Sequence, residues 1–90
     1  MEIVILDGAQ MTGAAEAHRY LARVLRFPAY YGGNLDALAD CLGELGSQVY
    51  VILTNGAALR AQLGDYGARL IRVFEELSAA PGAFTWIERV

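Results

Sequence analysis

The sequence contains no lysine, and Cys41 is its only cysteine in 90 residues. A single cysteine excludes an internal disulfide, and proteins without disulfides are typical of a reducing compartment. No apolar run approaches the length of a membrane-spanning helix, and the opening residues lack the basic start of a secretory signal. These absences predict a cytoplasmic protein that does not enter a membrane and folds without covalent cross-links.

The charges are unevenly distributed. All 7 basic residues are arginines, and 10 acidic residues bring the net charge to -3. No arginine occurs from Phe27 to Leu59, so the carboxylates of this stretch have no basic neighbour in sequence. Phosphate contacts require a basic footprint, so the sequence argues against direct binding to nucleic acid. A basic protein partner fits this charge pattern better.

Strand-like and helix-like segments alternate along the chain. A hydrophobic fraction of 56% supplies one modest core, which predicts a single domain over residues 1–90. The patterns predict strands at 2–6, 49–53 and 84–90, and helices at about 12–26, 34–45, 57–63 and 65–79. Strands joined through helices in the order βααβααβ predict an α/β fold with a three-stranded parallel sheet packed with helices. The apolar run 49–53 is expected to be its central strand, buried on both faces.

Local signals predict where the first two helices begin and end. Thr12 is expected to cap the first helix, and Pro28 to stop it, because the residue before a proline is biased out of the helical region. Asn34 is a good N-cap for the second helix. The buried side of that helix is expected to carry Leu35, Leu38, Leu42 and Leu45.

The second helix also carries carboxylates at every fourth residue, at Asp36, Asp40 and Glu44. Residues four apart share a helix face, and like charges so placed repel by about 0.2–0.5 kcal/mol per pair. No basic residue nearby in sequence relieves this repulsion. We therefore expect the compensating charge to belong to another molecule.

The run from Tyr30 to Leu42, the Val-Phe-Glu-Glu segment at 73–76, the lone His18 and the order of strands and helices resemble the barstar family over nearly the whole chain. Members of this family are intracellular inhibitors of secreted, barnase-type ribonucleases. The specific part of the likeness is the loop and helix of 30–42. The resemblance implies a protein without enzymatic activity or cofactor, monomeric when free, that plugs the active site of a basic ribonuclease with its second helix and the preceding loop.

The resemblance also implies a partner-binding surface on that loop, that helix and one later residue: Tyr30, Tyr31, Gly32, Asn34, Leu35, Asp36, Ala39, Asp40, Gly43, Glu44 and Glu76. By matching positions, Asp40 would be the main phosphate mimic. Supporting contacts would come from Tyr30, Asn34, Asp36 and Glu76, while Tyr31 and Gly32 shape the loop. Charge steering and a dominant interface aspartate are properties of the barnase and barstar pair itself, and they come with the resemblance.

The chain departs from the best-known family member at two large aromatic positions. That member carries a tryptophan where this chain has Ala39, and a second just after the helix, where this chain has Glu44 and Leu45. Without these anchors, the footprint is expected to be weaker, shifted, or matched to a different nuclease.

The sequence also allows two other functions. Asp36, Asp40 and Glu44 offer oxygen ligands to Mg²⁺, as in a small metal-dependent hydrolase, although no nearby base would hold a phosphorylated substrate. Alternatively, the same fold serves as an interaction module that binds a basic protein without inhibiting it. Calorimetry with Mg²⁺ and a ribonuclease panel would separate these functions.

Single residues have purely structural alternatives as well. In these alternatives, Asp36 would complement the helix dipole and Asp40 would be an ordinary solvated acid on the surface. Glu76 would form an exposed ion pair with Arg72. One residue of the Tyr30–Tyr31 pair anchors the loop, and the two glycines after it serve backbone geometry. On this interpretation the lone histidine is hydrogen-bonded within its helix layer, and the cysteine is a small buried residue.

Overall fold

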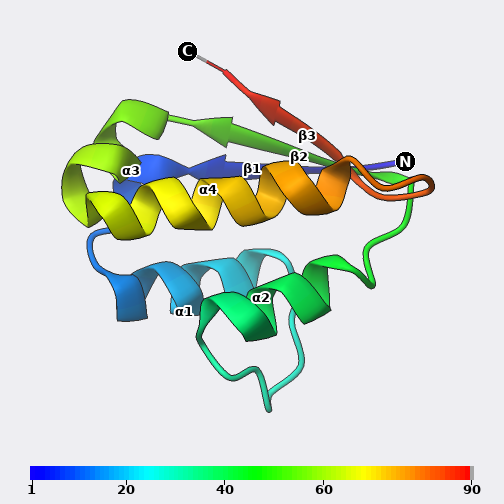
Figure 1. Ribbon diagram of the computed structural model, residues 1–90, viewed down its shortest axis with the longest axis horizontal. Coiled ribbons are helices and arrows are strands. Elements are labelled where there is room, and N and C mark those ends of the chain that lie inside the picture. The colour runs from blue at the N-terminus through cyan, green and yellow to red at the C-terminus, as the bar shows by residue number, and fades with distance from the viewer. Residues whose placement is uncertain (90) are drawn as a thin grey trace.

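A computed structural model describes residues 1–89 of the protein. Its strands are β1 (Glu2–Asp7), β2 (Val49–Thr54) and β3 (Thr85–Glu88), and its helices are a short 3₁₀ turn, η1 (Gly8–Gln10), followed by α1 (Ala14–Val24), α2 (Leu35–Leu42), α3 (Gly56–Leu63) and α4 (Asp65–Ser78). The strands form a parallel sheet in the order β1-β2-β3 (Figure 1). The predicted α/β fold and element order are confirmed. Val90, the end of the predicted last strand, lies outside the described residues.

The main helices lie on one face of this sheet (Figure 1). α1 packs against β1 and α4 against β3, while α2 packs against α4 on the side away from the sheet. Aromatic rings tie α4 to β3, because Phe74 meets Phe84 edge to face, with ring centroids 6.2 Å apart, and stacks on Trp86 at 4.6 Å. The remaining core is mostly leucine, with Leu6, Leu21, Leu38, Leu42, Leu53, Leu59 and Leu70 at most 1% exposed. α2 is thereby the helix farthest from the sheet, with one side left to solvent.

The opposite face of the sheet is not covered by a helix within residues 1–89 (Figure 1). On that face Ile3, Ile5 and Ile87 expose 56%, 47% and 40% of their surface. Tyr50 and Ile52 of the central strand are only partly buried there. The prediction of a central strand buried on both sides was therefore wrong for one side. An uninterrupted apolar run is typical of double coverage, and here the neighbouring strands β1 and β3 shield β2 only in part.

The N-cap of α1 lies one residue later than predicted, at Gly13 instead of Thr12. Gly13 is the N-cap, with an extended backbone, and its carbonyl accepts the N–H of Ala17 at 2.8 Å. Thr12 stands one position before the cap and makes no capping bond, so that prediction was wrong. The hydroxyl of a residue at this position is too far from the second and third helical amides to satisfy them.

α1 also ends earlier than Pro28 would require. Arg26 adopts a left-handed conformation with φ 58°, and the N–H of Phe27 donates to the carbonyl of Ala22 at 2.9 Å. This is a Schellman termination, which closes a helix by satisfying its last carbonyls. It ends α1 at Val24 rather than at the predicted residue 26, and it turns the chain away before the proline is reached.

Candidate protein-binding surface

α2 presents two aspartates on its outer side. The helix begins at Asn34, whose side-chain oxygen accepts the N–H of Ala37 at 2.8 Å, so the predicted cap is confirmed. Asp36 lies in the first turn and Asp40 one turn later, and both are exposed. The leucines on the other side of α2 pack into the core, which fixes the direction in which the carboxylates point.

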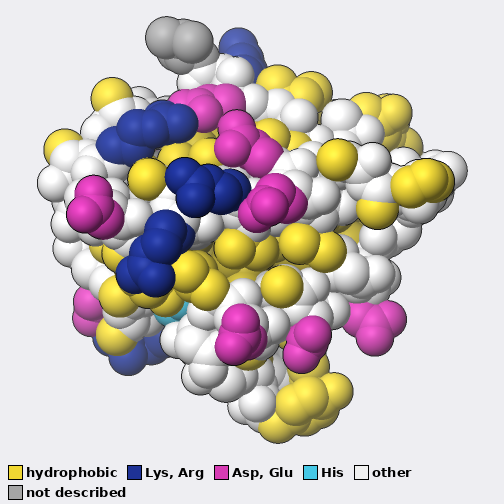
Figure 2. Space-filling model, viewed as in Figure 1, with side chains coloured by type: hydrophobic (Ala, Val, Ile, Leu, Met, Phe, Trp, Pro, Cys, Tyr) yellow, Lys and Arg dark blue, Asp and Glu magenta, His cyan; other side chains and the backbone are white. Residues whose placement is uncertain are grey.

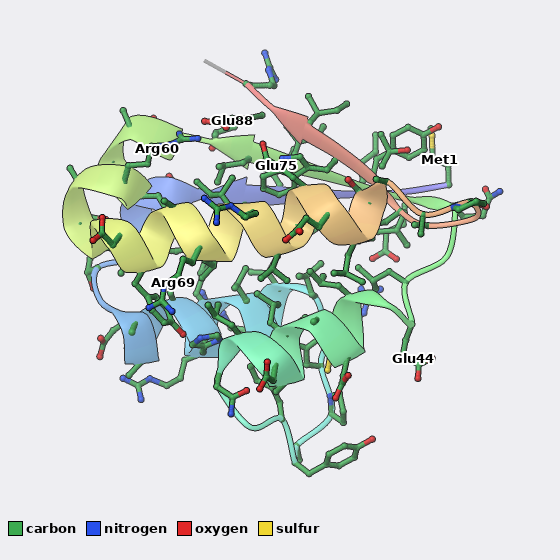
Figure 3. All side chains as sticks on the ribbon, in the orientation of Figure 1. Met1, Glu44, Arg60, Arg69, Glu75 and Glu88 are labelled. Carbon is green, nitrogen blue, oxygen red and sulfur yellow. The ribbon has the colours of Figure 1, made fainter. Side chains whose placement is uncertain are left out.

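Glu44 does not belong to the same helix. α2 ends at Leu42, and Gly43 is its C-cap. The next two residues continue in tighter turns, with the N–H of Glu44 donating to the carbonyl of Cys41 at 3.1 Å and the N–H of Leu45 to that of Leu42 at the same distance. Figure 3 shows Glu44 beyond the helix end, pointing into solvent. The predicted helical row of three carboxylates is therefore shortened to two, because the helix ends at Leu42 and the chain continues in tighter turns.

The carboxylates of this surface form no ion pair within residues 1–89. The ion pairs of residues 1–89 are Glu16 with Arg19, Glu2 with Arg26, and Glu88 with Arg60. None involves the four acidic side chains expected at the surface, which are Asp36, Asp40, Glu44 and Glu76. In Figure 2, magenta side chains lie over α2, whereas dark blue and magenta side chains lie together over α4 and the sheet. The pairing of Glu76 with Arg72 that its spacing allows is not formed in the described part of the chain.

The two tyrosines of the loop point in different directions. Tyr30 is 88% exposed. Tyr31 is partly buried, packs on Phe27 with ring centroids 4.8 Å apart, and its burial raises its pKa. Gly33 takes a left-handed backbone with φ 69°, which glycine adopts without strain. One tyrosine thus anchors the loop, as predicted, and the other is left free for contact.

The histidine that anchors this loop is a residue whose role the sequence did not reveal. His18 of α1 is 4% exposed and is hydrogen-bonded at both ring nitrogens. The hydroxyl of Tyr31 lies 2.7 Å from Nδ1, and that of Tyr66 in α4 lies 2.6 Å from Nε2. The expectation that His18 is satisfied within the fold is confirmed. Neither tyrosine is near it in sequence, so no local pattern could have identified these partners.

A shallow pocket of about 250 Å³ joins the loop to the acidic side of α2. Tyr30, Asp40 and Glu44 stand around it, together with Arg26, which forms its ion pair with Glu2, and an apolar set of Leu25, Phe27, Pro28, Cys41 and Leu45. The Cys41 thiol has its pKa raised by burial, and further by the charges of Asp40 and Glu44. The structure thus brings these three site residues together, while Asn34 and Asp36 lie at the other end of α2 and Glu76 on α4. Leu35 and Ala39 are half-buried under them.

Residues 1–89 contain neither a metal-binding cluster nor a membrane-spanning helix. No group of three or more His, Cys, Asp or Glu side chains is placed to hold a metal ion there. No helix in that range has the length and apolar character needed to span a bilayer. Asp36, Asp40 and Glu44 in particular do not converge on a common point.

Within residues 1–89 the protein is thus a small parallel α/β domain whose second helix exposes two aspartates that form no ion pair. Over residues 1–85 the sequence matches the family model described as Barstar (barnase inhibitor), and the chain belongs to this family. It is also 36% identical over 77 residues to YrdF of Bacillus subtilis (strain 168), a protein named as a candidate ribonuclease inhibitor, with 84% of this chain and 85% of the relative covered. The protein is a barstar-family ribonuclease inhibitor.

Membership of a non-enzymatic family decides one alternative left open by the residues. The hypothesis of a magnesium-dependent hydrolase was wrong. The three carboxylates on which that hypothesis was based do not lie on one helix. Asp36 and Asp40 belong to α2, whereas Glu44 lies beyond its end. The fold and the carboxylates are accounted for without chemistry on a substrate.

Proposed function

We propose that this protein inhibits a basic, barnase-type ribonuclease by seating α2 and the loop before it in the active site, where Asp40 takes the place of an RNA phosphate. The observation that carries the proposal is the absence of any arginine partner for Asp36 and Asp40 within residues 1–89, although other carboxylates of the same chain have one. Charges left unneutralised on a rigid helix are available to a partner's cations.

The physical basis is the substrate of the partner enzyme. A ribonuclease holds a phosphodiester with cationic groups that are already in place, so its cleft attracts any suitably spaced anion. Two carboxylates one helical turn apart present charges at about the separation of neighbouring helix-surface residues, roughly 5–6 Å. Because the Asn34 cap and the leucine side hold α2 in position, little ordering has to accompany binding.

The remaining residues have supporting roles in this proposal. Tyr30, nearly fully exposed, supplies an aromatic contact whose phenol can also hydrogen-bond. Asn34 and Asp36 extend the contact to the start of α2, and Glu76 adds a charge from α4. Tyr31 and Gly32 shape the loop, while Leu35, Ala39, Gly43 and Glu44 complete the surface around Asp40.

The pocket beside Asp40 indicates the type of side chain that would occupy it. Its wall is largely apolar, and Asp40 and Glu44 stand at its edge, while Arg26, which also lines it, is engaged by Glu2. An arginine or lysine of the nuclease matches both features, because the aliphatic stem can cover the apolar wall while the charged head meets Asp40 and Glu44. Ala39, where the best-known family member has a tryptophan, gives this part of the surface a smaller side chain.

The test is a titration of barnase activity with the wild-type protein and with two variants of equal charge. Asp40→Ala is expected to weaken inhibition by at least about a hundredfold, as for a central interface residue. Glu75→Ala removes one charge from the side of α4 near Arg60 and is expected to change inhibition by less than about threefold. Both variants should unfold within about 0.5 kcal/mol of wild type, because both carboxylates are exposed and neither forms an ion pair within residues 1–89.

Each alternative outcome has a separate meaning. Equal inhibition by Asp40→Ala and wild type would contradict the assigned mechanism. Binding of the nuclease without loss of its activity would favour a plain interaction module. A wild-type protein that leaves barnase both active and unbound would remove barnase as the partner.

A further inference from the structure

His18 connects the loop of the binding surface to two helices. Its ring lies between the hydroxyls of Tyr31 in the loop and Tyr66 in α4, and its own backbone belongs to α1. The loop backbone also passes close to it, since a Cβ built on Gly33 would lie 3.9 Å from the Cβ of His18. Two points of the loop therefore rest on one buried side chain.

Apart from the packing of Tyr31 on Phe27 and the core, few contacts hold the loop. Among the described residues, the bond from Tyr31 to His18 is the only side-chain hydrogen bond that joins 28–33 to a helix. The other bond within this stretch is a local turn, from the N–H of Tyr31 to the carbonyl of Pro28 at 3.0 Å. Loops with few buried contacts open locally at low cost, so one well-placed bond has a large effect on their order.

We propose that His18 is a positioning residue of the inhibitory surface, which holds Tyr31 and thereby fixes the loop at 30–34 in the conformation that meets the nuclease. This inference rests on the function proposed above. His18 does not contact the partner in this proposal. By holding Tyr31, it keeps the neighbouring Tyr30 and the start of α2 in fixed positions relative to Asp40. Tyr66 has a different task, because it ties the same ring to α4 and leaves the loop bond in place.

The chemistry of the ring supports a specific, neutral state. A neutral imidazole donates from one nitrogen and accepts at the other, which suits two tyrosine hydroxyls. Burial lowers the pKa of His18 from its ordinary value of 6.5. Arg19, which pairs with Glu16, and Arg23 line a surface pocket together with His18 and Tyr31. The guanidinium of Arg69 from α4 lies 5.3 Å from the centre of the Tyr66 ring, so the charged groups facing the histidine are mainly arginines.

The first test needs no nuclease and measures amide hydrogen exchange of residues 29–34 in the free protein. His18→Leu should raise exchange in this loop by about tenfold or more, because the loop loses its side-chain bond. His18→Gln, which keeps a donor and an acceptor, should restore part of the protection. Tyr66→Phe should leave the loop as slow as wild type. If His18→Leu does not fold, Tyr31→Phe removes the same bond from the loop side.

The second test measures inhibition of barnase by the same variants. His18→Leu is expected to inhibit about tenfold more weakly, and Tyr66→Phe to stay within about threefold of wild type, even if both lower the unfolding temperature equally. A loss of inhibition in Tyr66→Phe as large as that in His18→Leu would overturn the proposal, since it would show general destabilisation. Unchanged loop exchange in His18→Leu would overturn it independently. A wild-type protein that fails to inhibit would defeat the proposed function, while the exchange data would still decide whether His18 anchors the loop.

A pH profile gives a third readout that a passive packing role would not move. With a lowered pKa in the folded state, the unfolded chain binds more protons below pH 6.5, so stability should fall as the pH drops below that value and level off below the folded pKa. The protection factors of the loop amides, which correct for the base-catalysed slowing of intrinsic exchange at lower pH, should fall over the same range in wild type, and they should not do so in His18→Gln. An identical profile in both proteins would contradict the assignment of this effect to His18.

Discussion

Along α1 and at the sheet, glutamates lie against arginines, whereas on α2 and the turn after it the carboxylates face solvent without a cation in the described residues. The paired group is best represented by Arg60 and Glu88, which meet through two hydrogen bonds of 2.6 and 2.9 Å between α3 and β3. The unpaired group is represented by Asp36 and Asp40. Both groups are on the surface of the same small protein, so their difference cannot be attributed to burial.

The comparison separates charges that serve the fold from charges that serve a partner. An exposed ion pair contributes about 0–1 kcal/mol, and an unpaired like-charged neighbour on a helix costs about 0.2–0.5 kcal/mol. The fold therefore loses little by leaving Asp36 and Asp40 unpaired. At an interface that excludes water, the free energy of a carboxylate facing a cation is several times that of an exposed ion pair. Leaving these carboxylates unpaired therefore favours binding of a partner more than it harms folding.

The largest expected effect comes from giving α2 an internal partner. Asp40→Arg places a guanidinium four residues from Asp36 on the same helix, which imitates the paired half of the molecule. Inhibition should fall by at least about a thousandfold, because a hot-spot carboxylate is replaced by a charge that repels the nuclease. Stability should stay level or rise by about 0.2–0.5 kcal/mol through the new pair. Enzyme titration and urea unfolding measure the two quantities.

The value of this variant is that stability and inhibition should move in opposite directions. If inhibition by Asp40→Arg equals that of wild type, α2 does not face the nuclease. If both quantities fall together, the loss of function reflects damage to the fold rather than to the contact.

A smaller effect is expected on the rate of association. The unpaired carboxylates should steer a basic ribonuclease, so the association rate constant should fall roughly tenfold when ionic strength rises from about 0.05 to about 0.5 M. Stopped-flow mixing with barnase measures it. Asp36→Asn combined with Asp40→Asn should flatten this dependence, whereas Glu16→Gln with Glu88→Gln, which removes the same number of charges from the paired group, should change it much less. Equal flattening by both double variants would mean that only net charge matters.

The smallest effect is expected from breaking a pair in the other region. Glu88→Gln should lower the free energy of unfolding by about 0.5–1 kcal/mol at neutral pH and leave inhibition unchanged. The hydrogen bond from Arg60 lowers the pKa of Glu88 below its ordinary value of 4.5, so its contribution is present above that pH and is lost as the pH falls through the lowered pKa. The difference between variant and wild type should therefore shrink at about pH 3. A difference that persists there would contradict the ion pair as its source.

Sequence periodicity predicted most of the fold because strands and helices here follow local signals. The apolar runs, the Asn34 cap and the leucine spacing are each read within a few residues, and all agree with the structure. The prediction errors arose where two local signals compete, or where segments distant in sequence determine a helix end or the burial of a strand. Arg26 ends α1 through a backbone motif that no residue preference announces, and Gly43 ends α2 before Glu44. The uncovered face of β2 depends on where the helices pack, which its own apolar residues do not show.

For the candidate site, the sequence indicated the residues but not their surroundings. Asp36 and Asp40 could be placed on one exposed face from spacing alone. The contacts of His18 with Tyr31 and Tyr66 join positions 13 and 48 residues apart, which only the packed helices bring together. The ion pairing of Arg26 likewise required the structure, because this arginine lines the pocket beside Asp40 and yet pairs with Glu2.

Cys41 makes the binding surface accessible to chemical measurement. The thiol is the single one in the sequence, lines the pocket beside Asp40, and has a pKa raised by burial and by its acidic neighbours. Since the thiolate is the reacting form, modification by a disulfide reagent is slow at neutral pH and accelerates as the solution becomes alkaline. A protein seated over this pocket would shield the sulfur from the reagent. The speed of a colorimetric thiol assay therefore reports how much of the inhibitor is occupied, without a label or a substituted residue.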